Sequence, residues 1–212
     1  MSASLNQRDF EVERVLTELA AVGATSVRIF PEDFRLTLLK EAESYRYRPG
    51  RENVGSGDRI VRQQLSVFDA FADTSMYRSL KEAFQELVDQ SLANLRRYPF
   101  ATPLHFNSMT LQRYDSGSLG ITPHRDNLSY INLVCIFVVA GNGSFHICAD
   151  RSGTGTREIP APPGHVILMK APGFLGTKDR PFHYVTGIQQ PRYTFGLRQD
   201  RAHACAGVSA AK

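Results

Sequence analysis

The chain has 212 residues, of which 42% are hydrophobic and 22% are charged, and its formal net charge is +4. These values are close to those of an average globular domain, so they exclude a largely disordered chain. No apolar run is long enough to cross a bilayer, and the first residues lack the pattern of a secretory signal. Three cysteines without a C-x-x-C pair predict neither a disulfide framework nor a zinc site. We therefore expect a cytoplasmic protein without a membrane partner.

Helical spacing of apolar residues dominates the first half of the chain. In chain order we expect a helix over 12–22 ended by Gly23, a strand over 26–30, a helix from Pro31 to Tyr45, a loop over 49–58, a strand over 61–67 and a helix over 76–95. The loop over 49–58 is interpreted either as a mobile lid over a pocket or as a plain surface loop.

From about residue 104 the apolar pattern alternates with a period of two, which is typical of strands. A first strand over 104–114 would place Phe106, Ser108, Thr110, Gln112 and Tyr114 on one face, which is polar enough to line a barrel that holds a charged ligand. Further strands are expected near 119–124, 130–140, 143–149, 156–159, 164–169, 182–188 and 192–199, with a hairpin turn at Gly141–Gly143.

Helices followed by many short antiparallel strands predict an α+β fold, a double-stranded β-helix of the jelly-roll type backed by N-terminal helices. We expect a single domain over 1–200, with helical support in 1–100 and the jelly-roll core in 104–199. Residues 201–212 have little to pack against and are expected to form a loose C-terminal tail.

Two histidines and one aspartate form the motif with the clearest chemistry. His124 and Asp126 are two residues apart, so on a strand their side chains point to the same face. Together with His183 they would supply the 2-His-1-carboxylate set that holds a non-heme Fe(II) ion and leaves coordination positions open. His105, His146 and His165 fall outside this pattern and are interpreted as structural or surface residues.

Two arginines follow on a strand near the C-terminus. Arg192 and Arg198 have the same parity, so both belong to one face with Thr194 and Gly196. Long guanidinium side chains leaning inward from the two ends of this face would fit a five-carbon dicarboxylate between them.

This combination of motifs resembles the Fe(II)/2-oxoglutarate-dependent dioxygenases, and within them the AlkB-like group. The resemblance covers less than half of the chain and rests on Leu111-Gln-Arg-Tyr-Asp-Ser-Gly, His124-x-Asp126, Gly164-His-Val-Ile-Leu before His183, and Arg192-x5-Arg198-Gln199. It implies that His124, Asp126 and His183 bind iron, and that Tyr114, Arg192 and Arg198 bind the cosubstrate 2-oxoglutarate.

The chain departs from the AlkB-like pattern at two positions. Gln112 stands where the group usually has Asn, and we keep it among the cosubstrate-binding residues. Nucleobase-repairing members often carry an acidic residue where this chain has Leu128, which favours a substrate other than nucleic acid. The resemblance also implies that 2-oxoglutarate is converted to succinate and CO2 while a substrate is hydroxylated or demethylated. We place Arg192 on the distal carboxylate and Arg198 nearer the metal.

Three functions are compatible with these motifs. The first is hydroxylation of a small molecule, the second is oxidative demethylation of nucleic acid, and the third is binding without catalysis on the same fold. A net charge of +4 and the absence of Trp do not indicate a nucleic-acid partner, so we predict a small-molecule substrate. Candidate substrate contacts, chosen by position alone, are Arg62, Arg125, Asn127 and Tyr130. The sequence leaves the oligomeric state open.

Overall fold

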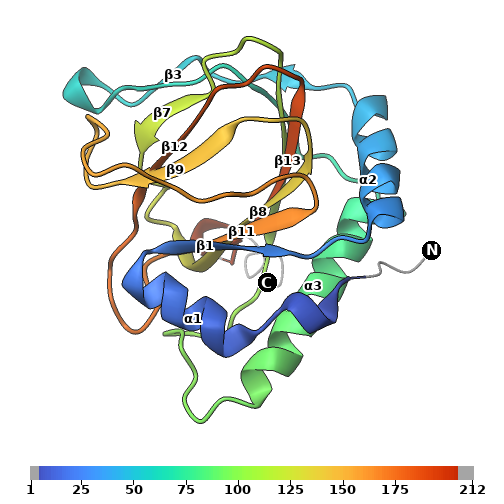
Figure 1. The fold of residues 1–212 in the computed structure, drawn as a ribbon, viewed down its shortest axis with the longest axis vertical. Helices are drawn as coiled ribbons and strands as arrows, with labels where there is room; N and C mark the ends of the chain where they lie inside the picture. The colour runs from blue at the N-terminus through green and yellow to red at the C-terminus, as the bar shows by residue number, and fades with distance from the viewer. Residues whose placement is uncertain (1–4, 205–212) are drawn as a thin grey trace, which may run out of the picture.

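The structure is a computed structural model that describes residues 5–204. Two antiparallel sheets form its centre and three helices cover one side (Figure 1). The longer helices are α1 (Val12–Ala21), α2 (Glu32–Ser44) and α3 (Met76–Ala93), and a four-residue helix, α4 (Arg201–Ala204), ends the described chain. Among residues 5–204, no helix combines the length and the apolar content that a membrane span requires.

The larger sheet has seven strands in the order β1-β11-β8-β13-β6-β5-β2. Their bounds are β1 (Ala24–Arg28), β11 (His165–Lys170), β8 (Tyr130–Ala140), β13 (Arg192–Asp200), β6 (Ser108–Tyr114), β5 (Ser66–Phe68) and β2 (Arg48–Pro49). The smaller sheet has four strands, β10 (Arg157–Glu158), β9 (Ser144–Cys148), β12 (Phe182–Thr186) and β7 (Ile121–His124). A separate pair, β3 (Asn53–Val54) and β4 (Val61–Arg62), flanks the smaller sheet.

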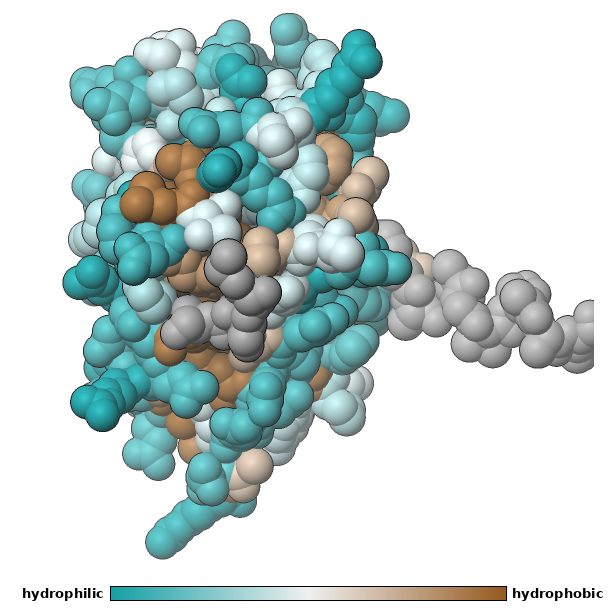
Figure 2. Space-filling view, turned by 90° about the vertical axis from the view of Figure 1, so that its right-hand side faces the viewer, coloured by the Kyte–Doolittle hydropathy of each residue, from teal (hydrophilic) through white to brown (hydrophobic). Residues whose placement is uncertain are grey.

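The seven-stranded sheet separates two hydrophobic cores, because successive side chains of a strand point to opposite faces. On β8, Leu133, Cys135 and Phe137 pack toward the helices, whereas Val134 and Val138 pack toward the smaller sheet. The helices contribute the apolar stripes that the sequence predicts, including Leu19, Leu38 and Phe84, each with no exposed surface. Figure 2 shows the side of the molecule that carries α2, where the surface is mostly hydrophilic with separate hydrophobic patches.

This arrangement is the double-stranded β-helix that the alternating pattern predicts. β8 spans the predicted range 130–140, and the turn at 141–143 joins it to β9. Gly141 and Gly143 both have positive φ, 84° and 122°, which glycine adopts at low cost. A Cβ on Gly141 would lie 2.2 Å from the carbonyl oxygen of Pro191, so the turn also requires a residue without a side chain.

Several predicted element bounds are wrong. The first strand covers 24–28 and not 26–30, because the main-chain amides of Ile29 and Phe30 both bond to the carbonyl of Gly164 beyond the ladder. The predicted strand 61–67 is two strands, β4 and β5, which belong to different sheets. The predicted loop 49–58 contains β3 and a 3-10 helix over Gly57–Arg59.

The predicted strand 104–114 begins only at Ser108. Phe106 therefore lies outside the alternation and is completely buried among the helix-side residues, not on the barrel face with Tyr114. The C-terminal prediction is wrong in its first part, since 201–204 form α4, which is attached by a bond from the Arg201 amide to the Ser129 carbonyl. Residues 205–212 lie outside the described residues.

Candidate metal and cosubstrate site

The candidate metal ligands come from two neighbouring strands of the smaller sheet. His124 ends β7, Asp126 follows it by two residues, and His183 is the second residue of β12. The β7–β12 register places His183 directly opposite His124, and their ring centroids are 4.2 Å apart. One ligand atom from each of the three residues lies within 4.8 Å of the others. Residues distant in the sequence therefore converge on one point.

Main-chain carbonyls orient both imidazoles. Nδ1 of His124 lies 2.9 Å from the carbonyl oxygen of Thr122, and Nδ1 of His183 lies 3.3 Å from that of Pro181. A proton on each Nδ1 would donate to these oxygens and leave the Nε2 lone pairs free toward Asp126. Burial, and next the positive charge that His124 can carry, lower the pKa of His183 to about 4, so its ring is neutral near pH 7. Neutral imidazole is the form that binds metals.

The Asp126 carboxylate lacks the internal partners that a buried anion needs. Its Oδ2 atom is buried without a hydrogen-bond partner in the described chain, and Oδ1 is 3.9 Å from Nε2 of His183. Burial raises the pKa of Asp126, but the charges of His183, Arg198 and other nearby cationic groups outweigh it, and the net shift is downward. An ionised oxygen without a donor, beside two imidazole lone pairs, fits a divalent cation.

Arg192 and Arg198 extend from β13 into the same cavity. Their exposed fractions are only 1% and 8%, and Nε of each is buried without a partner. Within residues 5–204 neither guanidinium has a carboxylate within 4 Å, and the one side-chain hydrogen bond of Arg192 goes from Nη1 to the carbonyl of Gly143 at 3.2 Å. Burial lowers the pKa of Arg192. Buried and unpaired guanidinium groups are costly, so they indicate a missing anionic ligand.

All seven residues predicted for the site line this one cavity: Gln112, Tyr114, His124, Asp126, His183, Arg192 and Arg198. Gln112 is close to two hydroxyls, since its Oε1 lies 3.4 Å from both Tyr114 Oη and Thr194 Oγ1. The remaining wall residues were not predicted as part of the site, although Thr194 was placed on the arginine face; they are Ile121, Ile136, Phe145, Val185 and Thr194. Alternation on β8 and β9 could have identified Ile136 and Phe145, once their inner face was known.

Gly196 was placed on the arginine face by its parity, but its role was not predicted. The guanidinium of Arg198 folds back over this glycine, and a Cβ on Gly196 would lie 2.6 Å from Nη1. The glycine therefore gives Arg198 the space to lie along its own strand. Arg198 also lies over the Tyr130 ring, with Cζ 5.2 Å from the ring centroid.

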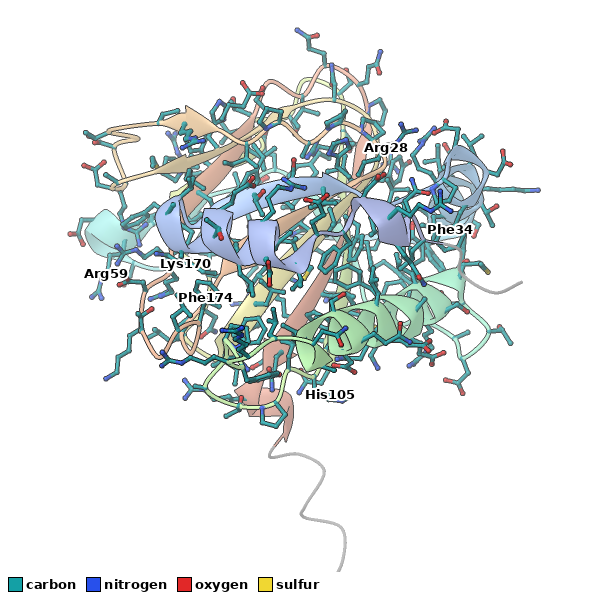
Figure 3. All side chains as sticks on the ribbon, turned by 60° about the horizontal axis from the view of Figure 1, so that its bottom comes forward. Arg28, Phe34, Arg59, His105, Lys170 and Phe174 are labelled. Carbon is teal, nitrogen blue, oxygen red and sulfur yellow. The ribbon has the colours of Figure 1, made fainter. Side chains whose placement is uncertain are left out.

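None of the four predicted substrate contacts is part of the cavity wall. Tyr130 reaches it only through Arg198, and Arg125 lies over Phe182 outside it. The histidines that we interpreted as structural also lie elsewhere. His146 stacks on Tyr184 across β9 and β12, and His105 is exposed at the periphery of the molecule (Figure 3).

No protein-family model matches the chain, and a search of curated proteins finds no match either. Solved structures do match. A prolyl hydroxylase from Trichoplax adhaerens, in complex with a peptide fragment of the hypoxia inducible factor oxygen degradation domain, superimposes with a TM-score of 0.66 at 14% identity. The match covers 93% of this chain and 92% of that one.

Two bacterial structures show the same similarity. A prolyl-4-hydroxylase from Pseudomonas putida matches with a TM-score of 0.59 at 11% identity, over 89% of this chain and 98% of that one. A 2OG-Fe(II) oxygenase family oxidoreductase from Burkholderia pseudomallei matches with a TM-score of 0.57 at 12% identity, over 95% and 96%. The chain therefore has the fold of 2-oxoglutarate/Fe(II) oxygenases over nearly its whole length.

Proposed function

We propose that this protein is an Fe(II)- and 2-oxoglutarate-dependent dioxygenase that hydroxylates a small-molecule substrate and releases succinate and CO2. One observation carries the proposal. Among the described residues, two buried arginines without a carboxylate partner share a cavity with two oriented imidazoles and with a carboxylate whose Oδ2 has no hydrogen-bond partner. The first pair of groups suits a dicarboxylate and the second set suits a divalent metal. The fold similarity supports the same reaction class.

In this proposal His124, Asp126 and His183 hold Fe(II), and Arg192, Arg198, Tyr114 and Gln112 hold 2-oxoglutarate. When bound, Fe(II) and 2-oxoglutarate would supply the electrons that reduce O2, the oxidant, so that one oxygen atom enters the substrate and the other enters succinate. The chain's own residues bind and orient these groups. Of these two arginines, Arg198 is the one whose charge acts on Asp126 and His183, so we assign it to the metal end of 2-oxoglutarate and Arg192 to the distal carboxylate.

The apolar side chains of the cavity have a separate task. The cavity that contains the metal ligands and the arginines is also lined by Ile121, Ile136, Phe145 and Val185. These walls keep water from the buried charges and so strengthen each charge-assisted bond to a dicarboxylate.

The AlkB-like assignment and the nucleic-acid substrate that would go with it remain predictions. Leu128, at the position where an acidic residue would favour base reading, is 55% exposed and outside the cavity. The similar structures named as prolyl hydroxylases make a prolyl peptide worth including among the candidates. A binding protein without catalysis is the third alternative.

Succinate formation tests the proposal directly. The purified chain is mixed with Fe(II), ascorbate and 2-oxoglutarate, and succinate is measured with and without added amino acids, small metabolites, prolyl peptides and methylated oligonucleotides. We expect metal-dependent succinate that EDTA abolishes and that small molecules stimulate. Stimulation by oligonucleotides alone would contradict the substrate class, and no succinate under any condition would contradict the enzyme.

A further inference from the structure

Three arginine side chains lie close together beside the candidate metal ligands. Arg125 precedes Asp126 in the chain, and Arg180 donates a hydrogen bond to the main-chain oxygen of Asp126. Arg125 and Arg151 both lie against the ring of Phe182, with Cζ at 4.2 Å and 5.7 Å from its centroid. We call Arg125, Arg151, Arg180 and Phe182 the rim cluster.

The arginines of the rim cluster differ from other arginines of the described chain in having no acidic partner. Arg14, Arg48 and Arg113 each form an ion pair with an acidic side chain. In the part of the chain that the structure describes, none of the three rim guanidinium groups has a carboxylate within 4 Å. Within residues 5–204 the three positive charges therefore have no ion-pair partner, although the charge of Asp126 acts on Arg180.

The surroundings of two of these arginines show that their positive charges are unfavourably placed without an anion. Nη1 of Arg151 is buried and has no hydrogen-bond partner in the described chain. Arg180 lies close enough to Arg125 for the two positive charges to act on each other. Like charges held together in partial burial repel each other, and an external anion would relieve this repulsion.

The strand pattern fixes which side of the sheet the cluster occupies. Phe182 and His183 are neighbours on β12, so the phenyl ring points outward where the imidazole points into the cavity. Phe182 pairs with Cys148 on the neighbouring strand β9, just before the turn that carries Arg151. Because Phe182 is the first residue of β12, a molecule that touches both the metal ligands and the rim cluster must pass around the end of this strand.

We propose that the rim cluster binds the carboxylate or phosphate group of an extended substrate whose oxidised carbon lies at the metal. The guanidinium groups would hold the anion through paired charge-assisted hydrogen bonds, and contact with the Phe182 ring restrains two of them, Arg125 and Arg151. This anion is distinct from 2-oxoglutarate, which we assign to the buried Arg192 and Arg198. The placement of the oxidised carbon near the metal rests on the proposed function, whereas the anion site does not.

Calorimetric titration with three chain-length-matched probes tests the anion site. Octanoate, octyl phosphate and neutral octanamide are titrated into the full chain with saturating 2-oxoglutarate and Mn(II), which keep the probes away from Arg192 and Arg198. We expect at least one anion to bind at least 10-fold more tightly than octanamide. The stronger of octanoate and octyl phosphate identifies which anionic group the rim accepts.

Matched variants locate the binding. The double variant Arg125→Gln/Arg151→Gln should weaken the anion at least 10-fold, while Arg96→Gln/Arg97→Gln, which removes the same charge from exposed arginines after α3, should not. The proposal is overturned if neither anion binds, if octanamide binds equally, if the rim variant binds like the wild type or if the control loses as much. Tighter binding of a single-stranded oligonucleotide, lost in the rim variant, would also overturn it.

The two proposals can fail separately. Repeating the titration after EDTA treatment, without 2-oxoglutarate, measures anion binding in a protein that cannot turn over. Because the probes can then also reach Arg192 and Arg198, only the binding that the Arg125→Gln/Arg151→Gln variant loses is assigned to the rim cluster. If the anion binds in this titration but the succinate assay shows no metal-dependent succinate, the proposed function is rejected and the anion site is retained. If metal-dependent succinate forms but no anion binds, the anion site is rejected and the proposed function is retained.

Discussion

At the scale of single residues, the site depends on polar groups that are buried before any ligand arrives. Arg192 is 1% exposed, yet its Nε has no hydrogen-bond partner within residues 5–204, and neither has the buried Oδ2 of Asp126. Such groups reduce the stability of the empty protein and increase its affinity for ligands of the right charge. Substitutions here should therefore affect ligand binding and stability in different directions.

Replacing His183 by Ala should abolish metal binding and leave the fold intact. The remaining ligands, His124 and Asp126, cannot complete a three-point face, and even the loss of a ligand's supporting partner typically costs about 10–100-fold in affinity. We expect Mn(II) binding, measured by calorimetry, to weaken by more than about 100-fold. His146→Ala, on the outer face of the same sheet, is the control and should bind normally. Full metal occupancy in the His183 variant would refute the ligand assignment.

Arg192→Leu should lower the affinity for 2-oxoglutarate without lowering the stability of the protein. A charge-assisted hydrogen bond contributes about 1.5–3 kcal/mol, so the dissociation constant should rise about 10–100-fold. The melting temperature of the ligand-free protein should stay the same or rise, because a buried unpaired charge is removed. Arg192→Lys should recover only part of the affinity, since a lysine lacks the two-pronged donor geometry. Equal 2-oxoglutarate affinity in all three proteins would contradict the role of Arg192.

Gly196→Ala should displace the Arg198 guanidinium without unfolding β13. The new Cβ would lie 2.6 Å from Nη1, and the flexible end of a side chain moves more easily than a backbone. We expect the melting temperature to change by less than about 3 °C, which corresponds to roughly 1 kcal/mol in a chain of this size. The affinity for 2-oxoglutarate should fall at least several-fold. If affinity is unchanged, Arg198 does not bind the cosubstrate in the conformation seen here.

At the scale of elements, the site exists because β7 and β12 are held in one register. Gly120 begins the approach to β7 with φ at +79°, and a Cβ there would lie 2.0 Å from the carbonyl oxygen of Val185 on β12. Close contact between the two backbones at this point sets His124 opposite His183. Gly120 therefore supports the metal site through its lack of a side chain, although it is not a metal ligand.

Gly120→Ala should destabilise the protein more than a glycine substitution without a clash. A residue other than glycine at positive φ costs about 1–2 kcal/mol, and the backbone contact adds to it. Gly187→Ala is the matched control, since its φ is +71° but nothing lies within 4 Å of the new Cβ. We expect the melting temperature of the Gly120 variant to fall several degrees further than that of the control, with weaker Mn(II) binding. Similar melting temperatures would show that the two strands can separate freely.

At the scale of the whole molecule, the sheet that carries the arginines is supported by the helices. Phe195 faces the helix side of β13 and packs against Tyr77, Phe71 and Phe137, with ring centroids between 4.8 and 5.9 Å away. Its neighbours on the same strand, Thr194 and Gly196, belong to the cavity face. The helical layer and the site are thus two faces of one strand.

Phe195→Ala should lower the free energy of unfolding by about 3–5 kcal/mol, because it leaves a cavity among aromatic rings. Chemical denaturation measures this value. Leu36→Ala on α2, where the side chain is 48% exposed, should cost less than about 0.5 kcal/mol. Saturating Mn(II) and 2-oxoglutarate should partly restore the stability of the Phe195 variant, since both bind only the folded state. A loss below about 1 kcal/mol would mean that the helical layer is loosely packed.

The sequence by itself determined which residues alternate and which chemistry they bring. Periodicity is a local property, so β8, the turn at Gly141, the helices and the shared face of Arg192 and Arg198 follow from neighbouring residues alone. Tertiary structure decided which strands meet. It opposed His183 to His124, split 61–67 between two sheets and turned Phe106 toward the helices. It also brought Arg151 and Arg180 beside Arg125, because contacts between distant segments depend on which faces are buried against each other.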